Sequence, residues 1–423
     1  MKSYDLIIIG AGAAGLAAAI AFRRRCEGSA LLIEAGDVAG RKILATGGGR
    51  CNLSNTAAPG WERTKEFFGS LGVLLDADVE GRAYPLTRNA ASVRDALVRE
   101  CESLGCSFMF GMRVSLLERG GNDDFVVRTE RRSAGIRGGG DGPVASPGQS
   151  AATAMRARQV VVATGGKARP AYGNLGDGYA FARSFGIKVN TVRPSLVPFV
   201  YADDVKGGLA KLAGVRARAR VRLVAAAADG DASPCAPAEA RGEVQFTDYG
   251  LSGICVFDLS RYYEPACCAV AIDFAPDHTE DEISELLASG RAAGLAGVVH
   301  PKVAEYIEEC VWQRRKGTVH GQKDTHEPSH SDLAATVKDF TVPIKGTKGW
   351  KAAQITSGGV AMSEVHEKYF ESNSVPGLYV VGEVLDLDGP SGGYNLGYAW
   401  NTGLAAGRAA GAYCASYLTI ETV

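Results

Sequence analysis

Residues 1–16 read MKSYDLIIIGAGAAGL and carry the clearest structural pattern of the chain. Residues 5–9 form a short apolar run rich in isoleucine, which is typical of a strand buried on both faces. Gly10, Gly12 and Gly15 follow in the spacing G-x-G-x-x-G, and helix-forming residues continue behind them. In such a turn the first glycine permits the tight bend, the second lets the backbone approach a pyrophosphate, and the third lets helix pack on strand. The stretch predicts a phosphate-binding turn whose helix N-terminus faces the ligand.

A second apolar run ends in an acid where a dinucleotide site needs one. Residues 30–33 are Ala-Leu-Leu-Ile, and Glu34 follows nineteen residues after Gly15. An acid about 20 positions beyond the glycines binds the ribose hydroxyls of a nucleotide, and a carboxylate there disfavours a 2′-phosphate. The pattern therefore predicts a site for FAD or NAD rather than NADP. The alternative is an empty βαβ unit with an incidental acid.

The composition is that of an ordinary globular protein. The 423 residues are 46% hydrophobic and 22% charged, with a formal net charge of −1. This balance offers no basic field for nucleic acid, and no apolar run approaches the ~20 residues of a membrane helix. The apolar N-terminal residues lead straight into a glycine turn, unlike a signal peptide. We therefore expect a cytoplasmic protein that binds neither nucleic acid nor membrane, and the oligomeric state stays open.

The cysteines and histidines do not predict a metal site. Ten cysteines and six histidines are present, but none of them shows C-x-x-C or zinc-ligand spacing. We therefore expect no bound metal, and we expect the cysteines to be reduced thiols that fill small spaces in the core.

A glycine-rich segment at 40–55, GRKILATGGGRCNLSN, is a candidate ligand-facing loop. Three consecutive glycines do not suit the interior of a helix or strand, and they let the backbone come close to something flat or anionic. Basic residues stand on both sides of the glycines, which a plain surface loop does not require. We predict that the loop faces the cofactor. Its candidate residues are Arg41, Lys42, Gly47, Gly48, Gly49, Arg50, Cys51 and Asn52.

The rest of the chain contains segments with the pattern of alternating strands and helices and one segment with a β-rich pattern. Residues 92–104 carry apolar side chains at helical spacing, and the apolar run 159–163 leads into a small-residue turn at Thr164 and Gly165. That turn predicts a second close approach to the ligand. Residues 191–278 have the pattern of a β-rich insert, and residues 279–316 are helical.

The final segment predicts a strand followed by a long helix. Residues 378–381 are a buried strand that ends in Gly382 and Glu383, and a helix is expected from about 395 to 417. Gly403, Gly407 and Gly411 recur every four residues within it. This spacing predicts that the helix packs closely against another helix.

The chain resembles the flavoproteins known as BaiN-type or aminoacetone-oxidase-like FAD-binding oxidoreductases. The motifs that carry the resemblance span nearly the whole chain. They are GAGAAG at 10–15, GRKILATGGGRCNLSN at 40–55, VVVATGG at 160–166, FTDYGLSG at 246–253, TSGGV at 356–360 and GLYVVGEVLDLDGPSGGYNLGYAWNTG at 377–403.

The resemblance implies an α/β fold with a Rossmann-like FAD-binding domain built from both chain ends. A β-rich, barrel-like domain and a helical segment would interrupt it. The expected boundaries are 1–190 for the N-terminal part of the FAD-binding domain, 191–278 for the insert, 279–345 for the helical segment and 346–423 for the C-terminal part.

The resemblance also assigns residues to parts of FAD. The phosphates would lie at Gly10, Gly12, Ala14 and Gly15, with the adenosine ribose on Glu34 and with Arg41 and Lys42 near the ribose or phosphates. Val114 would contact the adenine through its backbone, and Thr164 and Gly165 would form a second contact on the nucleotide side. Gly382 and Glu383 would meet the ribityl chain and pyrophosphate. The flavin ring would face Gly47, Gly48, Gly49, Arg50, Cys51, Asn52, Gly393, Tyr394, Asn395 and Leu396.

The expected activity is that of an FAD-dependent enzyme, an oxidoreductase. Only one dinucleotide fingerprint is present, so NADH or NADPH would act as a transient co-substrate at the flavin face. The resemblance implies reduction of a conjugated C=C bond in an apolar, steroid-like or bile-acid-like enone, a small-molecule substrate. Arg50, Tyr394 and Tyr249 are candidate proton donors, or else scaffold residues, and Cys51 is a redox thiol or a small residue beside the flavin. The alternatives are an amine or aminoketone oxidase that uses dioxygen, a tRNA-modifying flavoprotein and a non-catalytic redox sensor.

Overall fold

The computed structural model describes residues 1–131, 153–173, 175–225, 238–291, 293–316 and 328–421. The chain divides into two compact units, one formed by residues 1–193 and 355–423 and the other by residues 194–354. The chain leaves the first unit at β10 (Arg193–Ser195) and returns to it at β17 (Ile355–Ser357). Both ends of the chain therefore contribute to one unit, as the sequence predicts.

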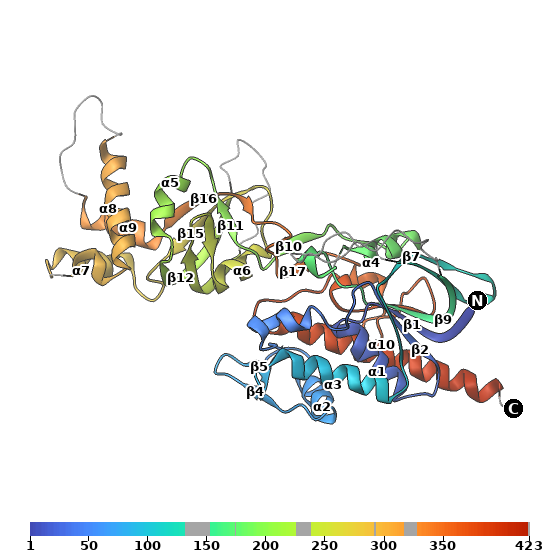
Figure 1. The fold of residues 1–423 in the computed structure, drawn as a ribbon. Helices are drawn as coiled ribbons and strands as arrows, with labels where there is room; N and C mark the ends of the chain where they lie inside the picture. Colours follow the sequence, from blue (N-terminus) through green and yellow to red (C-terminus); the bar gives the residue numbers. More distant parts are fainter. Residues whose placement is uncertain (132–152, 174, 226–237, 292, 317–327, 422–423) are drawn as a thin grey trace, which may run out of the picture. The chain divides into compact units, whose positions relative to one another are not determined.

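The first unit is built on a seven-stranded sheet (Figure 1). Its strand order is β6-β2-β1-β9-β8-β7, and β18 pairs with the end of β9. Strands β6, β2, β1, β9 and β18 run parallel, whereas β7 and β8 add an antiparallel excursion. The strands are β1 (Lys2–Ile9), β2 (Ala30–Glu34), β6 (Ser107–Phe110), β7 (Met112–Arg119), β8 (Phe125–Arg131), β9 (Thr153–Val162) and β18 (Leu378–Val380). Leu6 to Ile9 and Val160 to Val162 are nearly inaccessible, as expected for a parallel sheet covered on both faces.

Helices and a small second sheet complete this unit. The helices are α1 (Ala13–Arg23), α2 (Trp61–Ser70), α3 (Ala90–Ser103), α4 (Asp177–Ser184) and α10 (Tyr394–Glu421). The small sheet has the order β3-β5-β4, with β3 (Ser54–Asn55), β4 (Leu75–Ala77) and β5 (Arg82–Pro85). Helix α3 buries Val93, Leu97 and Cys101 on one face, which confirms the helix that the spacing at 92–104 predicts.

Helices α1 and α10 lie side by side because glycines remove the side chains between them (Figure 1). A Cβ atom on Gly403 would stand 2.2 Å from the carbonyl oxygen of Ala14, and one on Gly407 would stand 2.2 Å from that of Ala18. A Cβ on Gly411 would approach the Phe22 carbonyl oxygen to 3.0 Å. The predicted close packing of the glycine-bearing helix is confirmed, and its partner is α1.

The second unit contains a closed barrel of six strands in the order β11-β14-β13-β12-β15-β16. Strand β12 has the alternating pattern of a strand with one face in a core, because Ala219, Val221 and Leu223 are buried while Arg220 and Arg222 between them are half-buried and exposed, respectively. The barrel strands are β11 (Phe199–Tyr201), β12 (Arg216–Ala225), β13 (Glu239–Phe246), β14 (Gly250–Ser252), β15 (Cys267–Asp273) and β16 (Phe340–Thr347). The α/β class with a barrel-like insert is confirmed.

The helical segment shares the core of the barrel. Ile283, Val303 and Val337 belong to the same buried cluster as Phe246 and Val270 of the barrel strands. The helices of this unit are α5 (Lys206–Leu209), α6 (Ile254–Ser260), α7 (Glu280–Ala288), α8 (Pro301–Lys316) and α9 (His330–Lys338). Residues 279–345 are thus part of one compact unit with the barrel.

Candidate functional site

In the glycine turn between β1 and α1, packing requires two of the three glycines and leaves the third unexplained. A Cβ on Gly10 would stand 2.4 Å from the carbonyl oxygen of Ala163, and one on Gly15 would stand 2.0 Å from that of Gly10. Packing therefore requires both glycines. A Cβ on Gly12 would meet nothing within 4 Å, and its φ of −84° suits any residue. Neither sterics nor conformation demands glycine there, so the open space beside Gly12 fits a closely approaching phosphate.

Glu34 lies at the end of β2 with its carboxylate turned back to the glycine turn. Its Oε2 accepts a hydrogen bond from the Ala11 amide at 2.9 Å, and its Oε1 accepts one from the Gly36 amide at 2.8 Å. A carboxylate has about four lone-pair sites, so two remain for ribose hydroxyls. The backbone thus fixes the acid next to the predicted phosphate site.

The second predicted approach lies beside the first. Strand β9 pairs in parallel with β1, so that Val162 lies opposite Ile9 and the two chains leave the sheet together. The Cα of Thr164 would stand 3.2 Å from a Cβ on Gly10, and Gly165 has a left-handed φ of +73°. Val114 is a buried residue of β7, a strand that contacts β2 without pairing with it. The structure therefore gathers Thr164 and Gly165 at the glycine turn.

Gly382, in the C-terminal segment, lies against the start of α1. A Cβ on Gly382 would stand 2.9 Å from the Cβ of Ala14. The next residue, Glu383, accepts a hydrogen bond from Lys42 Nζ at 2.5 Å and a second from the Thr356 amide at 2.8 Å. An ion pair between residues 42 and 383 ties the glycine-rich loop to the C-terminal segment.

The glycine-rich loop follows a left-handed path. Gly47, Gly48 and Gly49 have φ values of 56°, 65° and 86°, and Cys51 has a φ of 59°. Three glycines in a row serve this conformation, which L-residues with side chains rarely adopt. Gly48 and Gly49 are exposed, and a Cβ on either would meet nothing within 4 Å. The loop therefore presents bare backbone, as expected for a segment that faces a flat ligand.

Asn52 joins this loop to the turn before α10. In the orientation that satisfies its hydrogen bonds, its amide donates to the carbonyl oxygens of Ala83 and Ser54 and accepts from the Gly393 amide at 3.2 Å. A Cβ on Gly393 would stand 2.2 Å from the Ser54 carbonyl oxygen. Asn52 thus positions the two segments, and its side chain is engaged by protein groups.

Asn395 closes the turn that opens α10. Its side-chain oxygen accepts from the Gly389 amide at 2.9 Å, and its Nδ2 donates to the carbonyl oxygens of Gly389 and Pro390 at 2.8 and 3.2 Å. Leu396 is half-buried and packs against the core cluster that includes the apolar residues of α1. Both residues hold the turn from within the protein.

The three candidate proton donors lie in different places. Arg50 is exposed, its Nε donates to the Gly47 carbonyl oxygen at 3.1 Å, and its guanidinium lies 5.4 Å from the ring centre of Tyr84. Tyr394 is the half-buried first residue of α10. Tyr249 belongs to the second unit, where Lys348 Nζ lies 3.1 Å from its ring centre. The structure brings Arg50 and Tyr394 to one unit and places Tyr249 in the other.

Three residues within the motifs at 40–55, 356–360 and 377–403 support the site, although their positions in those motifs do not predict these contacts. Thr356 Oγ1 accepts from the amides of Lys167 and Ala168, at 2.8 and 3.1 Å. Asn55 Nδ2 donates to the Gly392 carbonyl oxygen at 3.2 Å, and Trp400 Nε1 donates to that of Leu53 at 3.0 Å. Each of the three connects segments that are far apart in the chain.

Arg41, which the sequence predicts near the ribose or phosphates, is exposed beside Lys42.

Cys51 is predicted to take no part in redox chemistry. Burial raises the pKa of its thiol to about 12, against an opposing hydrogen bond with Thr46. The thiol therefore stays protonated at pH 7 to 9, where a reactive cysteine must be a thiolate. We expect iodoacetamide to modify the exposed Cys268 while Cys51 stays unmodified, as read by peptide mass mapping. Cys51→Ala should keep at least about half of the turnover. A tenfold loss with normal flavin content would contradict this.

The observations agree with an FAD site that is made of both chain ends. The space beside Gly12, the fixed carboxylate of Glu34 and the bare backbone at Gly48 fit the phosphates, ribose and ring of a dinucleotide. Among the described residues, no cluster of His, Cys, Asp or Glu could hold a metal ion. Within the same residues, no helix is both long and apolar enough to cross a bilayer.

Comparisons with known proteins agree with this site. The family model described as HI0933-like protein Rossmann domain matches residues 60–409, and an FAD binding domain model matches residues 5–68. A 3-dehydro-bile acid delta(4,6)-reductase of Clostridium scindens is 34% identical, over 95% of this chain and 98% of that protein. Ribosomal RNA dihydrouridine synthases of Escherichia coli and Haemophilus influenzae are 30% and 29% identical, each over 96% of this chain and 98% of the relative. The chain therefore belongs to the HI0933-like family of FAD-binding oxidoreductases.

Proposed function

We propose that this flavoprotein reduces a carbon–carbon double bond conjugated to a carbonyl group in an apolar ketone, with NADH or NADPH as the reductant. The observation that carries the proposal is the 34% identity, over 95% of the chain, to a reductase whose name denotes double-bond reduction in a 3-oxo bile acid. The dihydrouridine synthases also act on a C=C bond conjugated to a carbonyl, that of uracil. Because both names denote reduction of such a bond, the comparisons support this type of reaction more strongly than they support a bile acid or a uridine as the substrate.

The residues described above would hold FAD in the following way. The amides at the start of α1 and the space beside Gly12 would receive the pyrophosphate, and Glu34 would receive the ribose. The loop at 47–51 and the Gly393 turn would face the ring. FAD, when bound, supplies the hydride chemistry. The N-terminus of α10 would place positive potential at the ring, where negative charge develops on reduction.

Reduction of an enone also needs a proton at the carbon next to the carbonyl group, and we assign its delivery to Tyr394. Arg50 is permanently charged and so suits stabilisation of the carbonyl oxygen better than proton release. No described residue hydrogen-bonds the Tyr394 hydroxyl, which leaves it free to donate. It stands at the first position of α10, in the turn that Asn52 and Asn395 fix.

We expect Tyr394→Phe to lower kcat by about a hundredfold, since a positioned general acid contributes 10²–10⁴-fold, while KM and flavin content stay near the wild-type values. Tyr249→Phe is the matched control and should keep kcat within about twofold. The values of kcat and KM of both variants are measured by steady-state kinetics with an enone at several pH values. A Tyr394→Phe enzyme with full turnover would remove the residue from this role.

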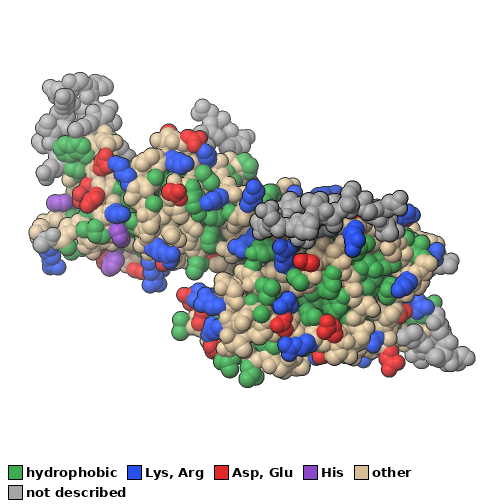
Figure 2. All heavy atoms as spheres, viewed as in Figure 1, with side chains coloured by type: hydrophobic (Ala, Val, Ile, Leu, Met, Phe, Trp, Pro, Cys, Tyr) green, Lys and Arg blue, Asp and Glu red, His purple; other side chains and the backbone are tan. Residues whose placement is uncertain are grey.

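A second candidate function is the reduction of a uridine in ribosomal RNA, which the two synthases at 30% and 29% identity favour. RNA binding depends on basic surface that neutralises phosphates. The chain has 46 basic and 47 acidic residues, and both kinds are interspersed over the face seen in Figure 2. This charge balance supports the small ketone as the substrate.

One anaerobic experiment separates the candidates. The purified yellow protein is mixed with NADH or NADPH, and reoxidation of the flavin is then followed with a steroid-type enone, with ribosomal RNA or with dioxygen. The proposal expects fast reoxidation by the enone alone. Reoxidation by RNA, with loss of uridine, would favour the second function. Reoxidation by oxygen alone would favour an amine or aminoketone oxidase.

A further inference from the structure

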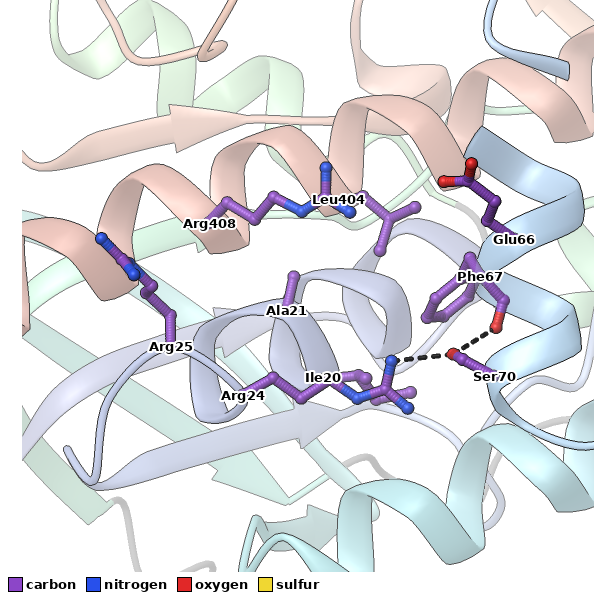
Figure 3. A pocket seen from close by; sticks show the side chains of 9 residues that line it. All are labelled: Ile20, Ala21, Arg24, Arg25, Glu66, Phe67, Ser70, Leu404 and Arg408. Atoms are coloured by element: carbon purple, nitrogen blue, oxygen red, sulfur yellow. Dashed lines mark hydrogen bonds between the residues drawn. The ribbon is translucent and has the colours of Figure 1, made fainter. Parts of the chain in front are cut away.

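An open surface cavity of about 350 Å³ lies on the first unit between α1, α2 and α10 (Figure 3). The end of α1 contributes Arg24 and Arg25, α10 contributes Arg408, and α2 contributes Glu66 on the opposite side (Figure 3). This volume is within the range of small-molecule sites. The charge of the lining is unbalanced, with three guanidinium groups against one carboxylate in a chain whose net charge is −1.

Two of these arginines have no partner in the part of the chain that the structure describes. Arg24 is engaged, because its guanidinium donates to Glu100 at 2.7 Å and to Ser70 Oγ at 2.9 Å. Arg25 and Arg408 make no side-chain hydrogen bond or ion pair with any described residue. Arg25 follows the C-terminus of α1, where the helix dipole favours a cation. Arg408 lies within the long helix α10, and both Arg25 and Arg408 are exposed, so their guanidinium groups are open to a ligand from solvent.

The cavity also has an apolar floor. Phe67 and Leu404 line it and are only 5% and 2% exposed as residues, and Ile20 beneath them is fully buried. A site with guanidinium groups at the rim and aliphatic and aromatic carbon below suits a ligand with two matching parts. The rim matches a carboxylate or another anion, and the floor matches an apolar body.

We propose that this cavity binds a small organic anion with an apolar body, at a site separate from the dinucleotide site. Arg25 and Arg408 bind the anionic group, and Phe67 and Leu404 contact the apolar part. The site lies along α1 from the glycine turn, since twelve residues from Gly12 to Arg24 correspond to about 18 Å at the rise of an α-helix.

The test uses the FAD-loaded protein and three probes: octanoate, 1-octanol and inorganic phosphate. Binding is measured by isothermal titration calorimetry and by ligand-observed NMR. Octanoate should bind more tightly than either other probe, because only octanoate satisfies both rim and floor. Arg408→Ala and Arg25→Ala should each weaken octanoate binding about tenfold or more, as expected for the loss of a charged hydrogen bond. Arg63→Ala on α2, an exposed arginine outside the cavity, is the matched control and should leave it unchanged.

Glu66→Gln should change the affinity for octanoate in the opposite direction. Removing the only carboxylate of the lining should strengthen octanoate binding by about two- to fivefold, which a merely damaged protein could not do. Equal loss in Arg63→Ala, binding of octanol as tight as that of octanoate, or no binding of octanoate would overturn the proposal. Phosphate binding as tight as octanoate binding would overturn the role of the apolar floor.

Discussion

Gly12→Asp is expected to give a folded protein that is purified without FAD. The position is the N-cap of α1, where aspartate is among the preferred residues, so the helix should be as stable as in the wild type or more stable. No protein atom lies within 4 Å of the new Cβ, and the φ of −84° is allowed for any residue. The carboxylate occupies the space assigned to the pyrophosphate. Two like charges about 4 Å apart repel by about 4 kcal/mol at an effective dielectric of 20, so FAD affinity should fall about a thousandfold.

Two further variants separate the causes of this loss. Gly12→Asn has the same shape without the charge and should weaken FAD binding less than Gly12→Asp does. Gly15→Ala places a Cβ 2.0 Å from the Gly10 carbonyl oxygen and should instead reduce the amount of folded protein. Circular dichroism reports the fold, and flavin absorbance against protein concentration reports the occupancy. A yellow Gly12→Asp protein would show that the phosphates lie elsewhere.

The features that sequence predicted are those with a local physical cause. The strand, glycine turn and helix at 1–23 follow from apolar periodicity and from glycine geometry within a few residues. The face of α3 and the glycine contact of α10 also follow from side-chain spacing along one helix. In each case the residues that give the prediction lie within the same short stretch as the element that they predict.

The contacts that assemble the site are not of this kind. Lys42 and Glu383 are 341 residues apart in the chain, and Asn55 and Gly392 are 337 apart. Nothing near a lysine specifies a carboxylate on a distant strand end, because the pairing depends on how α10 and the sheet pack. Asn52 illustrates the same limit. The sequence predicts a polar residue near the ring, whereas the structure uses its amide to hold Ser54, Ala83 and Gly393.

Gly407→Ala is expected to destabilise the first unit although alanine is the better helix former. In an exposed helix the change should stabilise by up to about 1 kcal/mol. Here the new Cβ would stand 2.2 Å from the Ala18 carbonyl oxygen, a distance that forces α10 away from α1. Overpacking of this kind costs about 1–3 kcal/mol, and the backbone atom cannot swing aside as a side chain can. We expect a net loss of about 2 kcal/mol in the free energy of unfolding, measured in urea by the release of flavin fluorescence.

Gly69→Ala in α2 is the matched control. Its Cβ would meet nothing within 4 Å, so the same substitution should be neutral or stabilising by a few tenths of a kcal/mol. The opposite signs of the two variants would assign the loss to the contact between α1 and α10. Because Gly403 makes the same contact at Ala14, next to the phosphate turn, displacement of α10 should also weaken FAD binding. If Gly407→Ala is as stable as Gly69→Ala, the two helices are not held in direct backbone contact, and the chain ends do not meet as described.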